Sequence, residues 1–268
     1  MNPRPRPTLH RLRQLHARGE PIAVLTCYDA TFARVLDEAG VDVMLVGDSL
    51  GMVCQGQADT LPVQMQEMIY HTASVARGNH GVWLIADMPF GSYQGQQDTA
   101  IANAVQLMQA GAHMVKVEGG GWTVSLVRAL VERGIPVCGH LGFTPQSVHA
   151  LGGYRIQGRD EEAVERLRLD AAALADAGAA MLVFELMPSA VARSVAQSLP
   201  IPVIGIGAGS GVGGQVLVLH DMLNLTAGRL PRYVRDFTEG SASIQAAVRR
   251  YVEDVKSGKF PDDTAHGY

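Results

Sequence analysis

Cysteine and excess positive charge are scarce in this sequence. Its 268 residues include three cysteines, Cys27, Cys54 and Cys138, with no Cys-x-x-Cys spacing. An odd number of cysteines among apolar neighbours argues against a disulfide framework and predicts reduced thiols in a cytoplasmic protein. The net charge of −4 provides no basic surface for a phosphate backbone. We therefore expect no nucleic-acid partner.

Long apolar runs are also missing. No run approaches the ~18 apolar residues that a membrane span requires, so we expect no membrane partner. The first 21 residues are rich in Pro and Arg but contain no apolar core of signal-peptide length. Thr8 as an N-cap and Gly19 as a stop predict an ordinary helix there rather than a targeting segment.

The sequence does contain a repeated alternation of short apolar runs and helical periodicity. Its hydrophobic content of 47% is enough for a large core, and no linker divides it, so we expect one domain over residues 1–268. The runs predict strands at 22–26, 43–46, 83–86, 114–117, 136–138, 181–184, 203–206 and 216–219. Helices are expected at 31–38, 63–77, 98–109, 123–133, 161–176 and 189–198.

Several of these helices end in glycine, at Gly40, Gly111, Gly134 and Gly178. Glycine supplies the left-handed C-cap, so the chain repeats one β/α unit about every 30 residues. Eight units predict a single-domain α/β fold, the (β/α)₈ TIM barrel, with an N-terminal helix and a C-terminal helix over 243–256. A doubly wound open sheet is the alternative, but it usually has fewer strands and a single binding crevice.

Two Gly-rich connections could carry function. The connection at 140–160 is long and contains aromatic residues, which predicts a lid or substrate loop, with a plain surface excursion as the alternative. In the second, Gly209, Gly211 and Gly214 match G-x-G-x-x-G, but the residues that follow read as a strand rather than a helix. That order argues against a dinucleotide site and favours a barrel loop that allows close approach of the backbone to a ligand, with phosphate binding as a minor option.

Four apolar runs lead directly into an acid, at Asp48, Asp87, Glu118 and Glu185. An acid is a poor residue for the end of a buried strand unless a metal or a substrate receives it. In a parallel barrel the carboxyl ends of the strands meet at one face, where active sites lie. The four acids therefore predict a single catalytic site.

The chemistry of each acid depends on its neighbours. Asp48 and Asp87, with the Ser49 hydroxyl beside them, suit Mg²⁺, which takes one or two carboxylates and keeps several waters. N-capping of the following helices is the alternative. Lys116 and Glu118 alternate along one strand, so both point into the barrel. Lys116 could meet a substrate carboxylate while Glu118 supports the metal, or the two could form a structural ion pair.

Glu185 follows a fully apolar strand, and poor hydration there would raise its pKa toward the pH at which a general base works. Capping is the weaker alternative, because Glu caps helices less well than Asp. His140 follows the predicted strand 136–138 and could either bind substrate or satisfy a loop. Asp29 is expected to cap the next helix.

Seven motifs in this order resemble one family, ketopantoate hydroxymethyltransferase (3-methyl-2-oxobutanoate hydroxymethyltransferase). They are LTCYD (25–29), VMLVGDSLGM (43–52), ADMPFGSY (86–93), MVKVEGG (114–120), PVCGHLGFTPQS (136–147), GGYRIQGR (152–159) and IPVIGIGAG (201–209). The resemblance runs through nearly the whole chain.

This resemblance implies a (β/α)₈ enzyme of pantothenate synthesis that transfers a hydroxymethyl group from 5,10-methylenetetrahydrofolate to 3-methyl-2-oxobutanoate, giving 2-dehydropantoate through an enolate. It implies one Mg²⁺ per subunit at Asp48, Asp87 and Glu118, the last directly or through water. It also implies a keto acid held by Asp48, Ser49, Asp87 and Lys116, and Glu185 as the proton acceptor. A homo-oligomer, commonly a decamer, is implied as well.

Three departures from the family pattern concern the folate pocket. Gly213 stands where the family usually has Asp, Asn224 stands where it usually has Gly, and the loop 91–98 is one residue longer. Two other functions stay open at this point. One is a Mg²⁺-dependent lyase or mutase of the phosphoenolpyruvate-type barrels, and the other is a non-catalytic oligomeric barrel that binds a ligand or acts as a scaffold.

Overall fold

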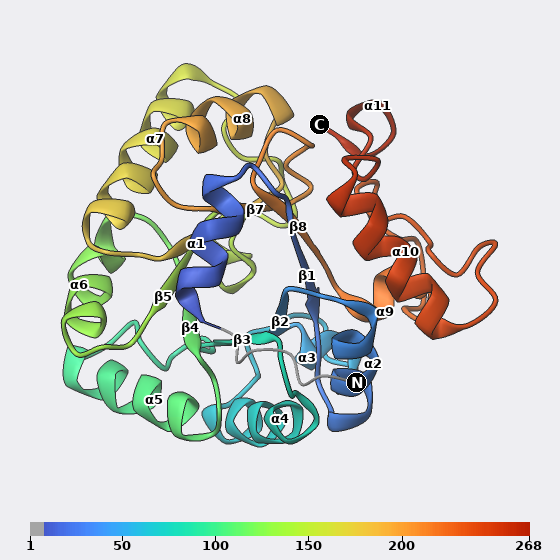
Figure 1. Ribbon diagram of the computed structural model, residues 1–268. Helices are drawn as coiled ribbons and strands as arrows, with labels where there is room; N and C mark the ends of the chain where they lie inside the picture. The colour runs from blue at the N-terminus through green and yellow to red at the C-terminus, as the bar shows by residue number, and fades with distance from the viewer. Residues whose placement is uncertain (1–7) are drawn as a thin grey trace.

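Eight parallel strands close into a barrel in the order β1-β2-β3-β4-β5-β6-β7-β8, as Figure 1 shows. This computed structural model describes residues 8–268, so the expectation of no targeting signal falls partly outside the described residues. The last strand pairs with the first, with Leu25 of β1 opposite Leu217 of β8. The closed ring confirms the predicted (β/α)₈ barrel and excludes the open sheet.

The strands agree with the prediction to within a residue except at two places. β5 extends four residues beyond its predicted end, and β8 begins two residues early, at Gly214. The strands are β1 (Ile22–Thr26), β2 (Val43–Val46), β3 (Trp83–Asp87), β4 (Met114–Glu118), β5 (Val137–Gly142), β6 (Met181–Glu185), β7 (Val203–Ile206) and β8 (Gly214–Leu217).

The predicted helices are present, and the short helices α3, α9 and α11 were not predicted. The helices are α1 (Leu9–Ala17), α2 (Ala30–Ala39), α3 (Leu50–Val53), α4 (Met65–Gly78), α5 (Gln97–Gln109), α6 (Val124–Glu132), α7 (Glu161–Asp176), α8 (Ser189–Gln197), α9 (Leu219–Met222), α10 (Ile244–Lys256) and α11 (Asp263–His266), with 3₁₀ turns at Gly121–Thr123 and Pro145–Ser147. Within residues 8–268, every helix is too short or too polar to cross a membrane.

Local signals explain where the helices begin and end. The Asp29 carboxylate accepts hydrogen bonds from the backbone N–H groups of Thr31 and Phe32, both at 2.8 Å, and so caps α2 as predicted. At the other end Gly40 adopts φ 91°, a left-handed conformation that glycine adopts at little cost. Thr8 likewise caps α1. These caps set the spacing of the β/α repeat.

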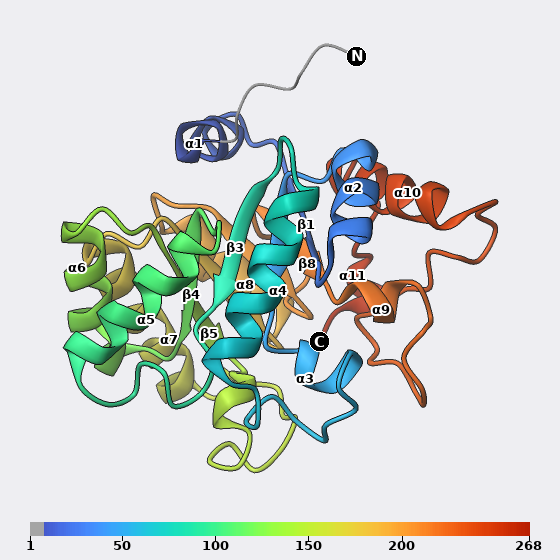
Figure 2. The same cartoon turned by 90° about the horizontal axis from the view of Figure 1, so that it is seen from below.

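One end of the barrel is closed by α1, which lies across it (Figures 1 and 2). Leu12 of α1 is buried among interior barrel residues that include Ile22 and Val43. The connection between β5 and α7 lies at the opposite end in Figure 2. The carboxyl ends of the strands therefore open on the side away from α1.

The C-terminal helix α10 packs against α2 and β1 on the outside of the barrel. Its Tyr251 is fully buried, and the hydroxyl group lies 2.8 Å from the Val24 carbonyl oxygen and 2.9 Å from that of Gln215. These two carbonyls belong to β1 and β8, so α10 covers the seam where the barrel closes.

Candidate active site

The four predicted acids end adjacent or nearby strands and face one cavity of about 680 Å³. Asp48 follows β2, Asp87 ends β3, Glu118 ends β4 and Glu185 ends β6. Each is nearly inaccessible to solvent. The cavity is also lined by Ser49, Lys116 and His140. The structure thus brings all the site residues predicted from the sequence to the same end of the barrel.

Lys116 lies between two of the acids. Its Nζ is 3.3 Å from Asp87 Oδ1 and 3.3 Å from Glu118 Oε1. Burial acts to lower the pKa of Lys116, but the two carboxylates outweigh burial and hold it well above its ordinary value. The side chain therefore carries a permanent positive charge at the floor of the cavity.

Glu118 is fully engaged with other protein groups. Its Oε1 lies 3.2 Å from His140 Nδ1 as well as near Lys116, and its Oε2 accepts a hydrogen bond from the backbone N–H of Gln146 at 2.9 Å. Burial alone would raise the pKa of Glu118, but the charges of Lys116 and His140 bring it down to about 2. Glu118 is therefore an ionised acid with both oxygens occupied.

Asp48 and Asp87 form a close pair of buried carboxylates. The backbone N–H of Asp48 donates to Asp87 Oδ2 at 3.1 Å. Burial raises the pKa of Asp48 well above its ordinary value, and the charges of Asp87 and Glu118 add to this effect. Asp87 Oδ1 is buried and accepts no hydrogen bond from the described residues, although the charged Lys116 Nζ lies 3.3 Å from it. A second positive charge beside the two aspartates would favour their ionised forms.

No group of three or more His, Cys, Asp or Glu side chains in residues 8–268 is arranged to hold a metal ion. This finding means that the predicted metal ligands, Asp48, Asp87 and Glu118, do not form a ready-made cluster. Glu118 contacts Lys116 instead. Asp48 and Asp87 alone still match the one or two carboxylates that Mg²⁺ requires, with water or substrate oxygens as the other ligands. Ser49 contacts the Tyr28 hydroxyl group, 2.9 Å from its Oγ.

His140 was predicted to follow a strand that ends at residue 138. The structure instead places it inside β5, which extends to Gly142. Its Nε2 is 3.2 Å from Glu185 Oε2, while its Nδ1 faces Glu118. Because the imidazole connects two acids of the cavity, the hypothesis that it only satisfies a loop is wrong. Burial raises the pKa of Glu185, and the contact with His140 opposes this only in part.

Gln146 is a site residue that sequence reasoning missed. It lies in the connection between β5 and α7, and its Nε2 donates to Asp48 Oδ2 at 2.8 Å and to the Met88 carbonyl oxygen at 2.9 Å. Its Oε1 accepts a hydrogen bond from the Tyr93 hydroxyl group at 2.7 Å. The connection thus contributes directly to the cavity and is not a plain surface excursion. The sequence signal that could have identified Gln146 was its position in the motif at 136–147.

The Gly-rich run at 207–214 is a barrel loop, because Gly214 begins β8 and not a helix. The structure does not support the expected link between Gly213 of this loop and the folate pocket. The backbone N–H of Ile22 donates to the Gly213 carbonyl oxygen at 3.0 Å, which places Gly213 at the amino end of the barrel. Gly213 therefore lies far from the acids and cannot alter a pocket at their end. Asn224 follows α9 with φ 53°.

Comparison with known proteins agrees with the geometry of the site. Residues 6–263 match the family model for ketopantoate hydroxymethyltransferase. The chain is 64% identical to 3-methyl-2-oxobutanoate hydroxymethyltransferase 2 of Methylibium petroleiphilum, covering 97% of this chain and 94% of that protein. It is 60% identical to the corresponding enzyme of Leptothrix cholodnii, covering 97% and 93%.

Solved structures share the fold at much lower identity. Phosphoenolpyruvate phosphomutase from Streptomyces platensis aligns with a TM-score of 0.59 at 18% identity, covering 79% of this chain and 81% of that one. Phosphonopyruvate hydrolase, solved with oxalate and Mg²⁺, also aligns with a TM-score of 0.59, at 16% identity and with 78% and 80% coverage. These two support the barrel alone, whereas the near full-length matches decide the family. The chain belongs to the ketopantoate hydroxymethyltransferase family, a family of transferases.

Proposed function

We propose that this enzyme uses 5,10-methylenetetrahydrofolate as the donor and 3-methyl-2-oxobutanoate as the acceptor, with Mg²⁺ bound at Asp48 and Asp87. The observation that carries the proposal is the separation of charges in the cavity. The charged Lys116 and the two aspartates lie on one side, and Glu185 lies on β6, opposite β2 in the ring of eight strands. A small keto acid between them would meet a cation on one side and a base on the other.

Each side chain then has a distinct task. Lys116 faces the carboxylate of the keto acid, and its raised pKa keeps it charged at neutral pH. Ser49, positioned by Tyr28, offers a hydroxyl group at the same end. Bound Mg²⁺ would stabilise negative charge on the keto oxygen as the C3 proton leaves, and such stabilisation is worth several kcal/mol.

Glu185 is the proposed general base. Its raised pKa gives it a higher proton affinity than an exposed carboxylate has. It takes the C3 proton, and the electron pair left behind forms a bond from C3 to the methylene carbon of the donor as the bond from that carbon to N10 breaks and N10 takes a proton. Water then supplies the hydroxyl oxygen by displacing N5 from the same carbon, and tetrahydrofolate leaves with a proton on N5. His140, 3.2 Å from Glu185, is placed to accept the proton or to orient the carboxylate.

The test follows the C3 proton of 3-methyl-2-oxobutanoate by NMR in D₂O, with Mg²⁺ and without folate. We expect the wild type to exchange this proton and Glu185→Gln to lose the exchange. Glu162→Gln, a change at an exposed acid on α7, is the control. Full exchange in Glu185→Gln would remove Glu185 from the base role. Product formation without any folate would refute the proposed donor and favour a lyase or mutase reaction.

A further inference from the structure

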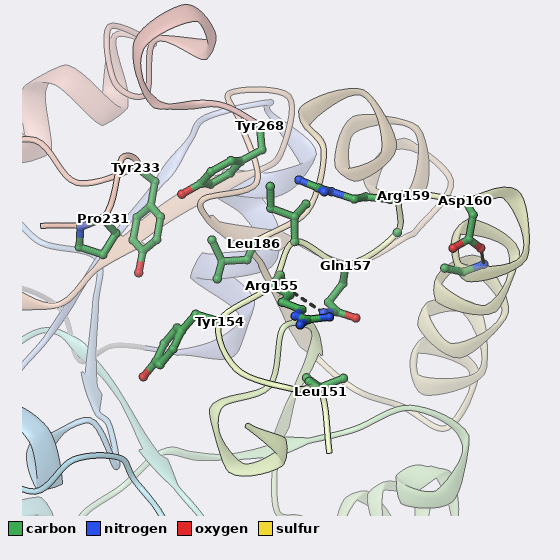
Figure 3. A pocket seen from close by; sticks show the side chains of 13 residues that line it. Leu151, Tyr154, Arg155, Gln157, Arg159, Asp160, Leu186, Pro231, Tyr233 and Tyr268 are labelled. Carbon is green, nitrogen blue, oxygen red and sulfur yellow. Dashed lines mark hydrogen bonds between the residues drawn. The ribbon is translucent and has the colours of Figure 1, made fainter. Parts of the chain in front are cut away.

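A second cavity of about 810 Å³ lies beside the catalytic one (Figure 3). Tyr154, Pro231 and Tyr233 line both cavities. The two spaces are therefore neighbours that share one wall, so a ligand longer than the keto acid could occupy both.

The second cavity carries positive charge that the protein does not use. Arg155 and Arg159 line it and are exposed, and neither guanidinium group has an ion-pair or hydrogen-bond partner in the described part of the chain. The acid in the lining is Asp160, whose carboxylate accepts a hydrogen bond from the backbone N–H of Ala163 at 2.9 Å to cap α7. The unpaired charge that faces the cavity is therefore cationic.

The ring of Tyr268 also lines this cavity. Its backbone oxygen accepts a hydrogen bond from the backbone N–H of Ser189 at 3.1 Å, at the start of α8, and so is directed toward that helix. The two arginines remain available for a ligand.

The rest of the lining is aromatic and apolar. Figure 3 shows the rings of Tyr154, Tyr233 and Tyr268 around Leu186, with Arg155 and Arg159 farther along. The Tyr154 ring packs on that of Phe143, with ring centroids 4.7 Å apart. Such a surface accepts a flat ring by stacking. The order of features away from the acids is therefore aromatic first and cationic second.

Resting on the function proposed above, we infer that this cavity binds the aminobenzoyl-glutamate part of the folate donor. The aminobenzoyl ring lies among the tyrosines, and the glutamate carboxylates meet Arg155 and Arg159. In the catalytic cavity Lys116 is assigned to the carboxylate of the keto acid, whereas Arg155 and Arg159 in the second cavity have no other assigned partner. The methylene carbon stays with the acids while the tail extends past Tyr154 and Tyr233.

The test compares two donors on the full-length enzyme with Mg²⁺. One is 5,10-methylenetetrahydrofolate, and the other is the 5,10-methylenetetrahydropteroyl amide, in which an uncharged amide group replaces the glutamate. Because charge-assisted bonds to carboxylates are lost, the double variant Arg155→Gln, Arg159→Gln should raise the KM for the folate donor about tenfold. The KM for the amide donor should stay the same. Arg168→Gln, an exposed arginine of α7 paired with Glu165, is the matched control.

The pattern of outcomes separates this inference from the proposed function. A rise in KM that is equal for both donors, or no rise for either, would overturn the inference. Exchange of the C3 proton, which needs no donor, reports that the double variant is folded. A wild type that makes no product from either donor would overturn the proposed donor itself, whatever the arginine variants do.

Discussion

The side-chain amide of Gln146 donates to the carboxylate of Asp48 at 2.8 Å, although 98 residues separate the two in sequence. The same side chain also reaches the Met88 carbonyl oxygen after β3, and its backbone N–H reaches Glu118 at the end of β4. One residue of the connection after β5 thus contacts groups at the ends of three different strands. The conformation of this connection and the positions of Asp48 and Glu118 therefore depend on each other.

Gln146→Leu should lower both stability and activity. The change leaves the buried Asp48 Oδ2 and the Met88 carbonyl oxygen without this donor, and a buried group left unpaired costs about 1–3 kcal/mol. Urea unfolding measures the stability, and Gln106→Leu, at an exposed glutamine of α5, is the control. Equal unfolding midpoints for the two variants would show that the Gln146 bonds contribute nothing to stability.

Lys116→Met should make the enzyme depend on Mg²⁺ for stability. Removing the cation leaves Asp87 and Glu118 without their shared partner, and breaking a buried ion pair in this way costs about 3–5 kcal/mol. A dication at Asp48 and Asp87 would replace part of the lost charge. Melting temperatures with and without Mg²⁺ should therefore differ more in Lys116→Met than in the wild type.

Lys259→Met, at an exposed lysine beyond α10, is the control for that comparison and should leave the Mg²⁺-induced shift unchanged. The prediction fails if Mg²⁺ raises the melting temperature of Lys116→Met by no more than that of the control.

Glu185→Gln should stabilise the protein at neutral pH while it removes activity. Burial raises the pKa of Glu185 in the folded state, so its protonated form is the one that folding favours. The stability that protonated Glu185 contributes is fully present below its pKa in the unfolded state. It is lost as the pH rises through its pKa in the folded state. Because Gln resembles the protonated acid, the stability advantage of the variant should grow as the pH rises from the ordinary pKa of a glutamate through the raised pKa of the folded state, as followed by urea unfolding.

The exposed Glu162→Gln serves again as the control here and should show no such trend. An advantage of Glu185→Gln that is independent of pH would mean that packing rather than charge burial is responsible.

Gly142→Ala should be far more damaging than Gly153→Ala. Both glycines have left-handed backbones, with φ 89° and φ 94°, so an alanine strains the backbone at either site. A Cβ at Gly142 would also overlap the Glu185 carbonyl oxygen, whereas one at Gly153 meets nothing within 4 Å. The melting temperature and the rate of C3 proton exchange should both fall in Gly142→Ala. Gly153→Ala is the matched control. Equal losses would leave backbone strain as the sole cause.

The barrel and its acids could be predicted because each depends on local pattern. Apolar runs and Gly caps are short-range features, and a carboxylate directly after such a run is placed at the barrel mouth by topology alone. β5 was predicted too short because Gly139, His140 and Gly142 have little intrinsic preference for a strand. Pairing of β5 with β6, with His140 opposite Val183, extends the strand regardless of that preference.

Contacts made across the fold could not be predicted in the same way. The role of Gln146 depends on a loop that returns over the barrel. The residue pattern of this loop does not indicate which groups it contacts. Gly213 was linked to the folate pocket because it lies in the loop after β7, but this loop returns along the barrel and brings Gly213 beside Ile22 at the start of β1. The spacing allowed Glu118 either to support a metal or to form an ion pair with Lys116, and the ion pair is the contact that the structure shows.

Helix α1 covers the amino end of the barrel, where Leu12 is buried among the interior side chains, so the catalytic cavity opens toward the carboxyl ends of the strands. In such a cavity the molecule that lies deepest must enter first and leave last. If the keto acid binds at the acids and the donor outside it, as proposed above, the donor could not bind productively before the acceptor. The hydroxymethylated product would likewise be held until tetrahydrofolate had moved away. A helix remote from every reacting atom would in this way impose a compulsory order on the kinetics.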